Sequence, residues 1–343
     1  MRLNALTMRR ARTRVEIVIL DSAALPPTRC GEVERRMNAV IKVGELAVAA
    51  IERQKWLDAP GYKLEHGLAL VFTTLGRRGR GLQDLLHGTW LGHPLHPALT
   101  DVPLGAWTAA VVLDAADSVS RRPDGWRQAA QLAVGIGVLG GVGAALTGLT
   151  DWQHTHDEGR RSGLVHGLLN SAALGLNTLS WRQRRNGRHT GARHTSALGY
   201  CLVLASSYLG GNLVFGHRIG VDHSQQASGP TGFVAVMPEV DLAEDLPHHI
   251  DCDGVDIVLI RHTGRIYAVG GQCTHLGAPM SQGWLYRGEL VCPWHGSRFN
   301  PDSGCATTGP ATAPLTRYDV RIAAGQIEVR HAAAPAMAAG APR

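Results

Sequence analysis

"CTHLGAP" at residues 273–279 and "CPWHGSRFN" at residues 292–300 are the two stretches that decide the fold of the C-terminal part of the chain. Each holds one cysteine and one histidine, spaced C-x-H and C-x-x-H, with sixteen residues between the two motifs. Thiolates together with imidazoles suit either a zinc ion or an iron–sulfur cluster. A zinc ion would take all four side chains, whereas a cluster would take two cysteines on one iron and two histidines on the other. Because neither stretch completes a site alone, we expect the two loops to hold one metal centre between them.

The residues around these loops have the pattern of a small β-domain. The stretch 254–271, "GVDIVLIRHTGRIYAVGG", alternates and is rich in Val and Ile, with His-Thr-Gly where a hairpin would turn. Further short strands are expected at 318–330. The polar stretch 221–231 contains Gly and Pro and marks a linker. The sequence therefore predicts an all-β domain over 232–330, followed by a low-complexity, disordered tail at 331–343.

The two loops resemble the signature of the Rieske [2Fe–2S] proteins, and the resemblance runs from about residue 232 to residue 330. Matched residue by residue, it implies that the two cysteines bind the inner iron and the two histidines bind the outer, exposed iron. It also places a serine where Rieske proteins often donate a hydrogen bond to a cluster sulfide. The implied ligands are Cys273, His275, Cys292 and His295, and the implied sulfide donor is Ser297.

The loops depart from the Rieske proteins of cytochrome bc complexes at two positions. Those proteins carry one further cysteine in each loop, joined as a disulfide, where this chain has Ala278 and Trp294. The site therefore resembles the Rieske ferredoxins. We expect a reduction potential in the lower or middle part of the Rieske range of about −150 to +300 mV.

Four apolar segments precede the linker, each near the roughly 20 residues that a membrane-spanning helix needs. The second contains Gly137 and Gly141 at the G-x-x-x-G spacing that lets helices approach closely in lipid. A soluble helical bundle is the alternative, because the segments are rich in Ala and Gly. The segments are 98–116, 129–149, 163–181 and 196–216.

The segments before the bundle are harder to assign. Residues 37–90 are expected to form a cytoplasmic or interfacial helical segment. Residues 1–36 resemble neither a domain nor an export signal, and they are treated as a non-native extension with Met37 as the true start.

The charge of the chain follows the apolar segments. Its formal net charge of +6 comes mainly from arginines in short runs between apolar stretches, as in loops that flank membrane helices. No basic surface interleaved with aromatic residues and no nucleic-acid motif occurs. Nucleic acid is therefore excluded as a partner, and contact with membrane lipid is predicted.

Residues 91–220 are predicted to form the membrane domain, and about residues 87–220 resemble a bacterial membrane family known only as a domain of unknown function, DUF2231. The resemblance rests on "WLGHPLHPALTDVPLGAW" (90–107) and "GLTDWQHTHDEGR" (148–160). It implies a four-helix membrane fold without a settled activity. The fold expected for the whole chain is thus an α-helical membrane domain followed by an all-β iron–sulfur domain.

Three polar residues mark a candidate site inside the bundle. His166 and Asn170 share one face of the third segment, and His96 opens the first segment. Because the first and third segments run parallel, both histidines are expected at one membrane surface. Haem b ligated by paired histidines and a quinone pocket are both candidates. A purely structural hydrogen-bond network and a helix start at His96-Pro97 are the structural alternatives.

These features predict a membrane-anchored Rieske electron carrier that exchanges electrons with a haem or quinone. The alternative is a ferredoxin-like component feeding an oxygenase or reductase, with the helices only as a tether. In either case the redox partner, a protein or a quinone, is not named by the sequence, and homo-oligomerisation stays open.

The side of the membrane is argued in two ways. The unpaired cysteines favour a cytoplasmic β-domain. The arginine distribution points weakly the other way, because loops 117–128 and 182–195 hold eight arginines, whereas loop 151–162 holds two, with Arg77, Arg78, Arg80 and Arg218 on its side. We expect the cytoplasmic side.

Overall fold

The computed structural model describes residues 42–120, 124–224 and 229–332. The predicted extension 1–36, the Met37 start and the tail 333–343 lie outside the described residues. The chain divides into a unit that ends at Ala47 and a unit that begins at Val48. In the first, residues 42–47 are helical. The second unit contains both the helical domain and the β-domain, so contacts between these two domains lie within one unit.

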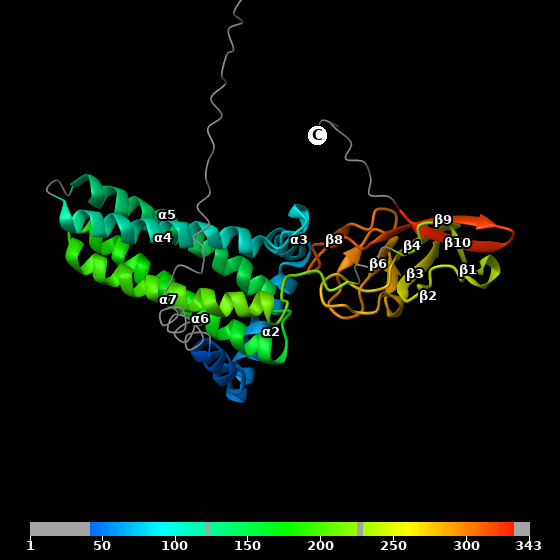
Figure 1. Ribbon diagram of the computed structural model, residues 1–343, viewed down its shortest axis with the longest axis horizontal. Helices are drawn as coiled ribbons and strands as arrows, with labels where there is room; N and C mark the ends of the chain where they lie inside the picture. Colours follow the sequence, from blue (N-terminus) through cyan, green and yellow to red (C-terminus); the bar gives the residue numbers. More distant parts are fainter. Residues whose placement is uncertain (1–41, 121–123, 225–228, 333–343) are drawn as a thin grey trace, which may run out of the picture. The chain divides into compact units, whose positions relative to one another are not determined.

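Four long helices form a bundle, with neighbours in the chain side by side (Figure 1). Each is 25 to 29 residues long, which at 1.5 Å per residue gives about 38 to 44 Å and exceeds a hydrocarbon core of about 30 Å. The connections are short, so successive helices run antiparallel. The helices are α4 (Leu95–Val119), α5 (Asp124–Trp152), α6 (Asp157–Arg185) and α7 (His189–Phe215).

By length and composition, three of these helices in the described residues are apolar enough to cross a membrane, namely α4, α5 and α7. The prediction of four apolar spans was therefore one too many. Helix α6 is long enough, but it buries Asn177, Ser180 and Arg184 against its neighbours. Its polar side chains are covered by protein, as is usual for polar groups within a membrane bundle.

Small residues of α5 let α4 pack closely against it. A Cβ at Gly137 or Gly141 would meet the ring of Trp107, and one at Gly140 would meet Val102 and Pro103. The G-x-x-x-G spacing is thus used inside the chain, between α5 and α4.

Charged residues join the helices at the end of the bundle far from the β-domain. Arg184 Nη1 and Nη2 donate to the two carboxylate oxygens of Asp114 at 2.8 and 2.5 Å, and both side chains are buried. Arg193 pairs with Asp117 next to them. A buried, bidentate pair of this kind fixes α6 against α4.

Shorter helices precede the bundle after helical residues 42–52, namely η2 (Lys55–Leu57), α2 (Asp58–Thr74), α3 (Gly76–His87) and η3 (Thr89–Leu91). Helix α3 ends at Gly88, which has φ +82° and caps the helix in the left-handed conformation that suits glycine. The last turn of α3 carries Asp84 and His87, both of which face the β-domain in the contacts described below.

The C-terminal domain consists of two antiparallel sheets (Figure 1). The larger has the order β1-β10-β9-β4-β3-β2 and the smaller the order β5-β6-β7-β8. The predicted hairpin is present, with Thr263 and Gly264 at positive φ in the turn between β3 and β4. The strands are β1 (Val234–Pro238), β2 (His248–Cys252), β3 (Val255–His262), β4 (Arg265–Gly270), β5 (Trp284–Tyr286), β6 (Glu289–Val291), β7 (Arg298–Phe299), β8 (Ala306–Thr308), β9 (Arg317–Ala323) and β10 (Gln326–His331), with η4 (Glu239–Asp241) and η5 (Met280–Gln282) between them.

The β-domain has two hydrophobic cores. One lies on the larger sheet around Ile257, Leu259 and Ile327. The other lies toward the smaller sheet and contains Cys273 and Cys292 among Val258, Met280, Leu290 and Phe299. The two candidate cysteine ligands are therefore fixed in a packed core.

Candidate metal centre

The two motif loops have the same backbone geometry. The first follows β4, and the second joins β6 to β7. In the first loop, Cys273 N–H donates to Ala278 O at 2.8 Å and Gly277 N–H donates to Cys273 O at 2.8 Å. In the second, Cys292 N–H donates to Ser297 O at 2.8 Å and Gly296 N–H donates to Cys292 O at 3.2 Å. Each loop thus folds back on its own cysteine before the rest of the domain contributes.

Both loops contain a glycine whose backbone conformation other residues rarely adopt. Gly277 has φ +75° and Gly296 has φ +72°, a region that costs other residues roughly 1–2 kcal/mol. A Cβ at Gly296 would meet nothing within 4 Å, so the requirement there is conformational rather than steric.

The four predicted ligands are brought together. Cys273 and Cys292 are each 1% exposed, and each thiol lies near enough to the other to shift its pKa. The rings of His275 and His295 lie edge to face with centroids 4.9 Å apart. His275 Nδ1 is buried and has no hydrogen-bond partner, which is costly unless a metal takes the position. Two core cysteines, two histidines at the rim and one orphaned ring nitrogen fit a [2Fe–2S] cluster with mixed ligands.

The protonation of these groups also suits metal binding. Burial, with the neighbouring His295 adding to it, lowers the pKa of His275 to about 3, so its ring is neutral at neutral pH. The hydrogen bond from the Cys273 thiol lowers the pKa of Cys292 to about 6, and the same pairing and burial raise the pKa of Cys273. Metal ligands must be neutral imidazoles and thiolates, and one of the two thiols is already near that state.

Ser297 is a residue of the second loop, and its side chain is fully buried. Its Oγ accepts a hydrogen bond from Ala311 N–H at 2.9 Å. That bond leaves the hydroxyl proton free to donate elsewhere, as the predicted role toward a cluster sulfide requires. Of the two positions that lack the disulfide cysteines, Ala278 is buried in the core and Trp294 is 56% exposed.

The edge formed by the two candidate histidines, His275 and His295, faces the helical domain. His156 Nε2 lies 3.0 Å from His295 Nε2, and the two rings are stacked with centroids 5.3 Å apart. The ring of His154 meets those of His275 and His295 at 6.0 and 5.8 Å. His154 and His156 come from the loop between α5 and α6. Both histidines lie in the stretch 148–160 that resembles DUF2231, but neither was predicted to be part of a site.

A further histidine from α3 lies behind His154. His87 is 1% exposed, its ring lies 5.2 Å from that of His154, and its Nδ1 donates to Asp151 Oδ1 at 2.8 Å. Burial, with the imidazoles around it, lowers the pKa of His154 to about 2, so this ring is neutral. We call His87, His154 and His156 the histidine pad.

Two other contacts hold the cluster loops against the helical domain. Gly309 N–H donates to Asp84 Oδ1 at 2.9 Å, beside the ring of His87. On the other side, His223 N–H donates to Thr274 O at 3.0 Å, which attaches the linker to the first cluster loop.

The predicted membrane residues also come together. The rings of His96 and His166 lie edge to face with centroids 6.3 Å apart. His96 Nδ1 is 2.8 Å from Ala144 O, and His166 Nδ1 is 2.9 Å from Ser206 O. Asn170 Nδ2 is 3.1 Å from His166 Nε2, so it contacts the ring directly. A Cβ at Gly148 would overlap the His96 ring, and one at Gly210 would press on the His166 ring, so glycines make the space for both.

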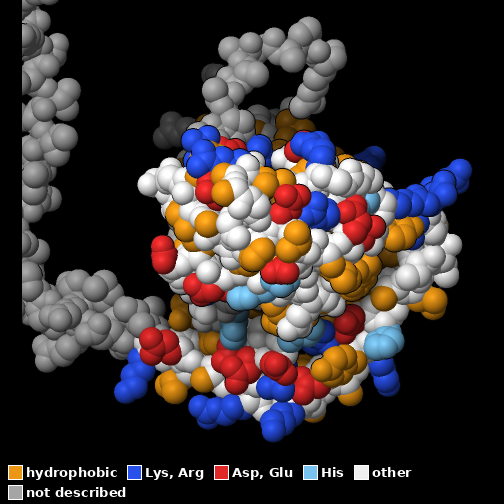
Figure 2. All heavy atoms as spheres, turned by 90° about the vertical axis from the view of Figure 1, so that its right-hand side faces the viewer, with side chains coloured by type: hydrophobic (Ala, Val, Ile, Leu, Met, Phe, Trp, Pro, Cys, Tyr) orange, Lys and Arg blue, Asp and Glu red, His pale blue; other side chains and the backbone are white. Residues whose placement is uncertain are grey.

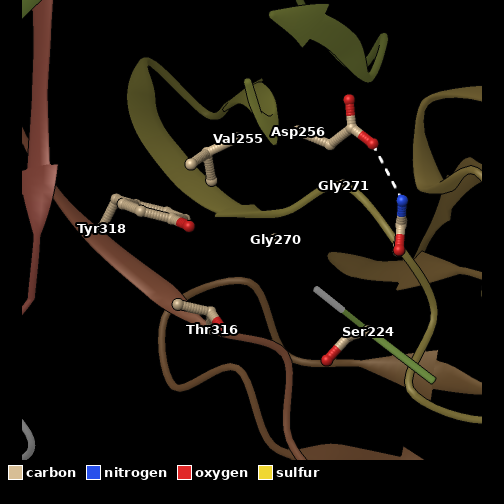
Figure 3. Close-up of a pocket in the computed structure, with 8 residues that line it drawn as sticks. Ser224, Val255, Asp256, Gly270, Gly271, Thr316 and Tyr318 are labelled. Carbon is tan, nitrogen blue, oxygen red and sulfur yellow. Dashed lines mark hydrogen bonds between the residues drawn. The ribbon is translucent and has the colours of Figure 1, made fainter. Parts of the chain in front are cut away.

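One small cavity of the β-domain and one face of the surface offer less. The cavity among Asp256, Gly271, Thr316 and Tyr318 (Figure 3) has a volume of about 10 Å³, room for one water at most. On the face shown in Figure 2, basic and acidic side chains are interspersed. That face carries no broad basic area of the kind that binds nucleic acid.

Two family models match the chain. The Rieske [2Fe-2S] domain matches residues 232–319, and the model described as "Predicted membrane protein (DUF2231)" matches residues 92–223. Both families were expected from the sequence, with the membrane domain preceding the Rieske domain in the chain. The comparison thus supports a [2Fe–2S] cluster and a location in a membrane.

Known proteins resemble the β-domain. The ferredoxin subunit of 3-phenylpropionate/cinnamic acid dioxygenase from Escherichia coli K12 is 38% identical over 91 residues, which are 26% of this chain and 85% of that protein. Human apoptosis-inducing factor 3 is 29% identical over 113 residues, 33% of this chain, and this chain spans only 19% of its length. Among solved structures, the ferredoxin of carbazole 1,9a-dioxygenase from Nocardioides aromaticivorans IC177 is 28% identical, covers 29% of this chain and 98% of its own, and has a TM-score of 0.28.

Proposed function

Because the chain belongs to the Rieske [2Fe-2S] family through residues 232–319, joined to a DUF2231 membrane domain, we propose that it passes electrons between its cluster and a carrier in its own membrane domain. Electron transfer by a Rieske domain and anchoring in a membrane are the general part of this function. The identity of the carrier, a haem or a quinone, is the specific part.

One observation carries the proposal. The histidine edge, through which Rieske clusters exchange electrons, meets the membrane domain at the 3.0 Å contact between His295 and His156. A Rieske protein that transferred electrons only to soluble partners would need this histidine edge to be exposed to solvent.

Each part of the chain has a defined task in this function. The buried cysteines hold the inner side of the site in the core, and the two histidines hold its outer side at the rim. When bound, the cluster supplies one-electron chemistry at a potential that the surrounding hydrogen bonds adjust. Ser297 fixes the Ala311 backbone and presents its hydroxyl to the site. The histidine pad orients His275 and His295 and excludes water from their exposed edge.

The carrier in the membrane domain would lie at His96 and His166. Both Nδ1 atoms are occupied by backbone carbonyls, which fixes the rings and leaves the Nε2 side for a ligand, with Asn170 to be displaced from His166. His156 caps the start of α6 and His166 lies ten residues further along it. At 1.5 Å per residue the two are about 15 Å apart along the helix. One helix therefore connects the cluster edge with the histidine pair.

A haem or a quinone bound at His96 and His166 would supply the membrane partner for one-electron exchange with the cluster. The chain offers Asn170 and the two histidines as polar groups for either ligand.

The test is the spectrum of the full-length protein purified in detergent, before and after dithionite. A haem would add a Soret band that His166→Ala abolishes while the cluster spectrum persists. A quinone site would instead let an added quinone reoxidise the reduced cluster, and His166→Ala would slow that reaction. A protein with a normal cluster, no pigment and no reaction with quinones would overturn the proposed membrane carrier.

The second candidate is a tethered ferredoxin that donates electrons to an oxygenase or reductase. It is favoured by the 38% identity to a dioxygenase ferredoxin subunit. In that case the edge held by His156 would have to open for each partner. Reduced protein would then transfer electrons to a soluble acceptor protein faster than to any quinone.

The β-domain is proposed to face the cytoplasm. Its cluster loops lack the disulfide cysteines, and Cys252 and Cys305 of the same domain are free. Protease digestion of spheroplasts tests the side, because a β-domain cut from outside would reverse the assignment.

A further inference from the structure

The contact between the cluster loops and the helical domain is built from three separate elements. The α5–α6 loop supplies His154 and His156, α3 supplies His87 and Asp84, and the linker supplies His223. Each of these elements contacts a different part of the two cluster loops or the residue Gly309, which follows strand β8. Three chain segments that converge on one rim define a docking surface rather than a single chance contact.

We propose that the histidine pad is the resident docking partner of the cluster's histidine edge, and that His156 is a positioning residue that sets the electronic state of His295. The proposal rests on the proposed function, since it presumes that a cluster is bound. It goes beyond that function by naming the group that receives the hydrogen bond of the outer ligand. It also names the group that an external partner would have to displace.

The chemistry of the contact follows from the ligand. A histidine that binds metal through one ring nitrogen carries its proton on the other. With His295 bound in this way, its Nε2–H donates to His156 Nε2 at 3.0 Å. A hydrogen bond from the outer nitrogen makes the imidazole a more basic ligand. A more basic ligand stabilises the oxidised iron, so the docked state favours the oxidised cluster.

His154 and His87 serve the geometry rather than this bond. The His154 ring lies edge to face against both ligand rings, and His87 packs behind it with Nδ1 held by Asp151. The ring of His87 also lies against Gly309, next to the hydrogen bond between Gly309 and Asp84. These contacts hold the loops where His156 can reach His295.

The first test compares His156→Ala and His156→Gln in the full-length protein, using the midpoint potential from an EPR-monitored titration. Removing the hydrogen bond should shift the ratio of reduced to oxidised cluster, at the wild-type midpoint, about 3- to 10-fold toward the reduced form. The amide oxygen of Gln also accepts a hydrogen bond, so His156→Gln should recover most of the shift. His248→Ala is the matched control, since His248 is exposed on β2.

The second readout measures access to the edge. The reduced cluster is mixed with ferricyanide, a one-electron oxidant, and its bleaching is followed by stopped flow. With the edge covered, His156→Ala should react several-fold faster than both the wild type and His248→Ala. His154→Ala removes packing that holds the loops near His156, so it should also speed the reaction, with a smaller shift of the midpoint than His156→Ala gives.

The outcomes separate the two levels of the account. Protein with a normal cluster whose potential and ferricyanide rate do not respond to His156→Ala would overturn the docking proposal and leave the Rieske assignment intact. Wild-type protein with zinc in place of iron would overturn both. If His156→Ala fails to hold its cluster, Gly309→Ala opens the same contact from the β-domain side and must give the faster reaction.

Discussion

Gly309→Ala is the substitution that should open the contact between the β-domain and the helical domain with the least other damage. A Cβ at Gly309 would lie 2.9 Å from His87 Cδ2, 3.2 Å from Cγ and 3.3 Å from Cβ. Carbon atoms pack at about 3.5–4.0 Å, so one side must retreat. His87 cannot retreat easily, because it is buried and its Nδ1 is held by Asp151 at 2.8 Å.

The magnitude follows from these contacts. Overpacking a well-packed site costs about 1–3 kcal/mol. The hydrogen bond from Gly309 N–H to Asp84 at 2.9 Å lies at the same point and would lengthen. A cost of 1–3 kcal/mol corresponds to about 5- to 150-fold in the equilibrium between docked and undocked forms.

The assay is the rate at which ferricyanide oxidises the reduced cluster, which should rise by about 5-fold or more if the rate follows the undocked fraction. Gly232→Ala is the control, because a Cβ at Gly232 would meet nothing within 4 Å. The reasoning is refuted if Gly309→Ala and Gly232→Ala react at the same rate and both keep the wild-type spectrum.

Four further outcomes are expected. Ser297→Ala should lower the midpoint potential and leave the iron content unchanged, because a buried hydroxyl at the site no longer stabilises the reduced cluster; an unchanged potential would remove Ser297 from the site. Gly296→Ala should weaken cluster retention by about 1–2 kcal/mol through its positive φ, and Gly296→Asn should weaken it less; equal retention by both variants and the wild type would contradict the loop geometry. Burial raises the pKa of Asp84 above its ordinary value, so ionisation of this carboxyl opposes folding, and the stability that it contributes is lost as pH rises through the folded pKa. Asp84→Asn keeps the acceptor for Gly309 and should raise the melting temperature at neutral pH, with a gain that shrinks as the pH falls through the folded pKa; a gain that grows on acidification would show the opposite sign. The midpoint potential should fall as pH rises in the alkaline range, by up to about 59 mV per pH unit for one proton per electron, because the oxidised cluster makes the outer histidine nitrogens more acidic; a flat curve would argue against histidine ligation.

The metal loops could be predicted from the sequence because each is determined locally. The cysteine, the glycine at positive φ and the closing hydrogen bonds lie within six residues of one another in both loops, for example from Cys292 to Ser297. The β-hairpin from Val255 to Gly270 is equally local, with its turn at Thr263 and Gly264.

The partner of the cluster edge could not be predicted in the same way. His156 and His295 are 139 residues apart, and their contact depends on how the α5–α6 loop meets the β-domain. The only local signal was a His-x-His pair at residues 154–156, at the end of the bundle where the chain enters the linker. Histidines in such a loop are ordinary unless a second domain is known to face them.

Two features of the bundle could be determined only from the structure. His96 was predicted either as a helix start or as a site residue, and its ring in fact lies against the glycine gap at Gly148 and hydrogen-bonds Ala144 O. The third segment was counted as an apolar span, but α6 carries buried Asn177 and Arg184, which satisfy their polar groups with Ser196 and Asp114. Hydropathy along one helix cannot show which of its polar groups a neighbour will cover.

The most direct test of the central claim is a pulsed EPR measurement on the reduced full-length protein, together with its iron and sulfide content. The account predicts about two irons and two labile sulfides per chain, with two histidine nitrogens coupled to the cluster spin and lost stepwise in His275→Cys and His295→Cys. Zinc in stoichiometric amount, or a cluster without nitrogen coupling, would contradict it.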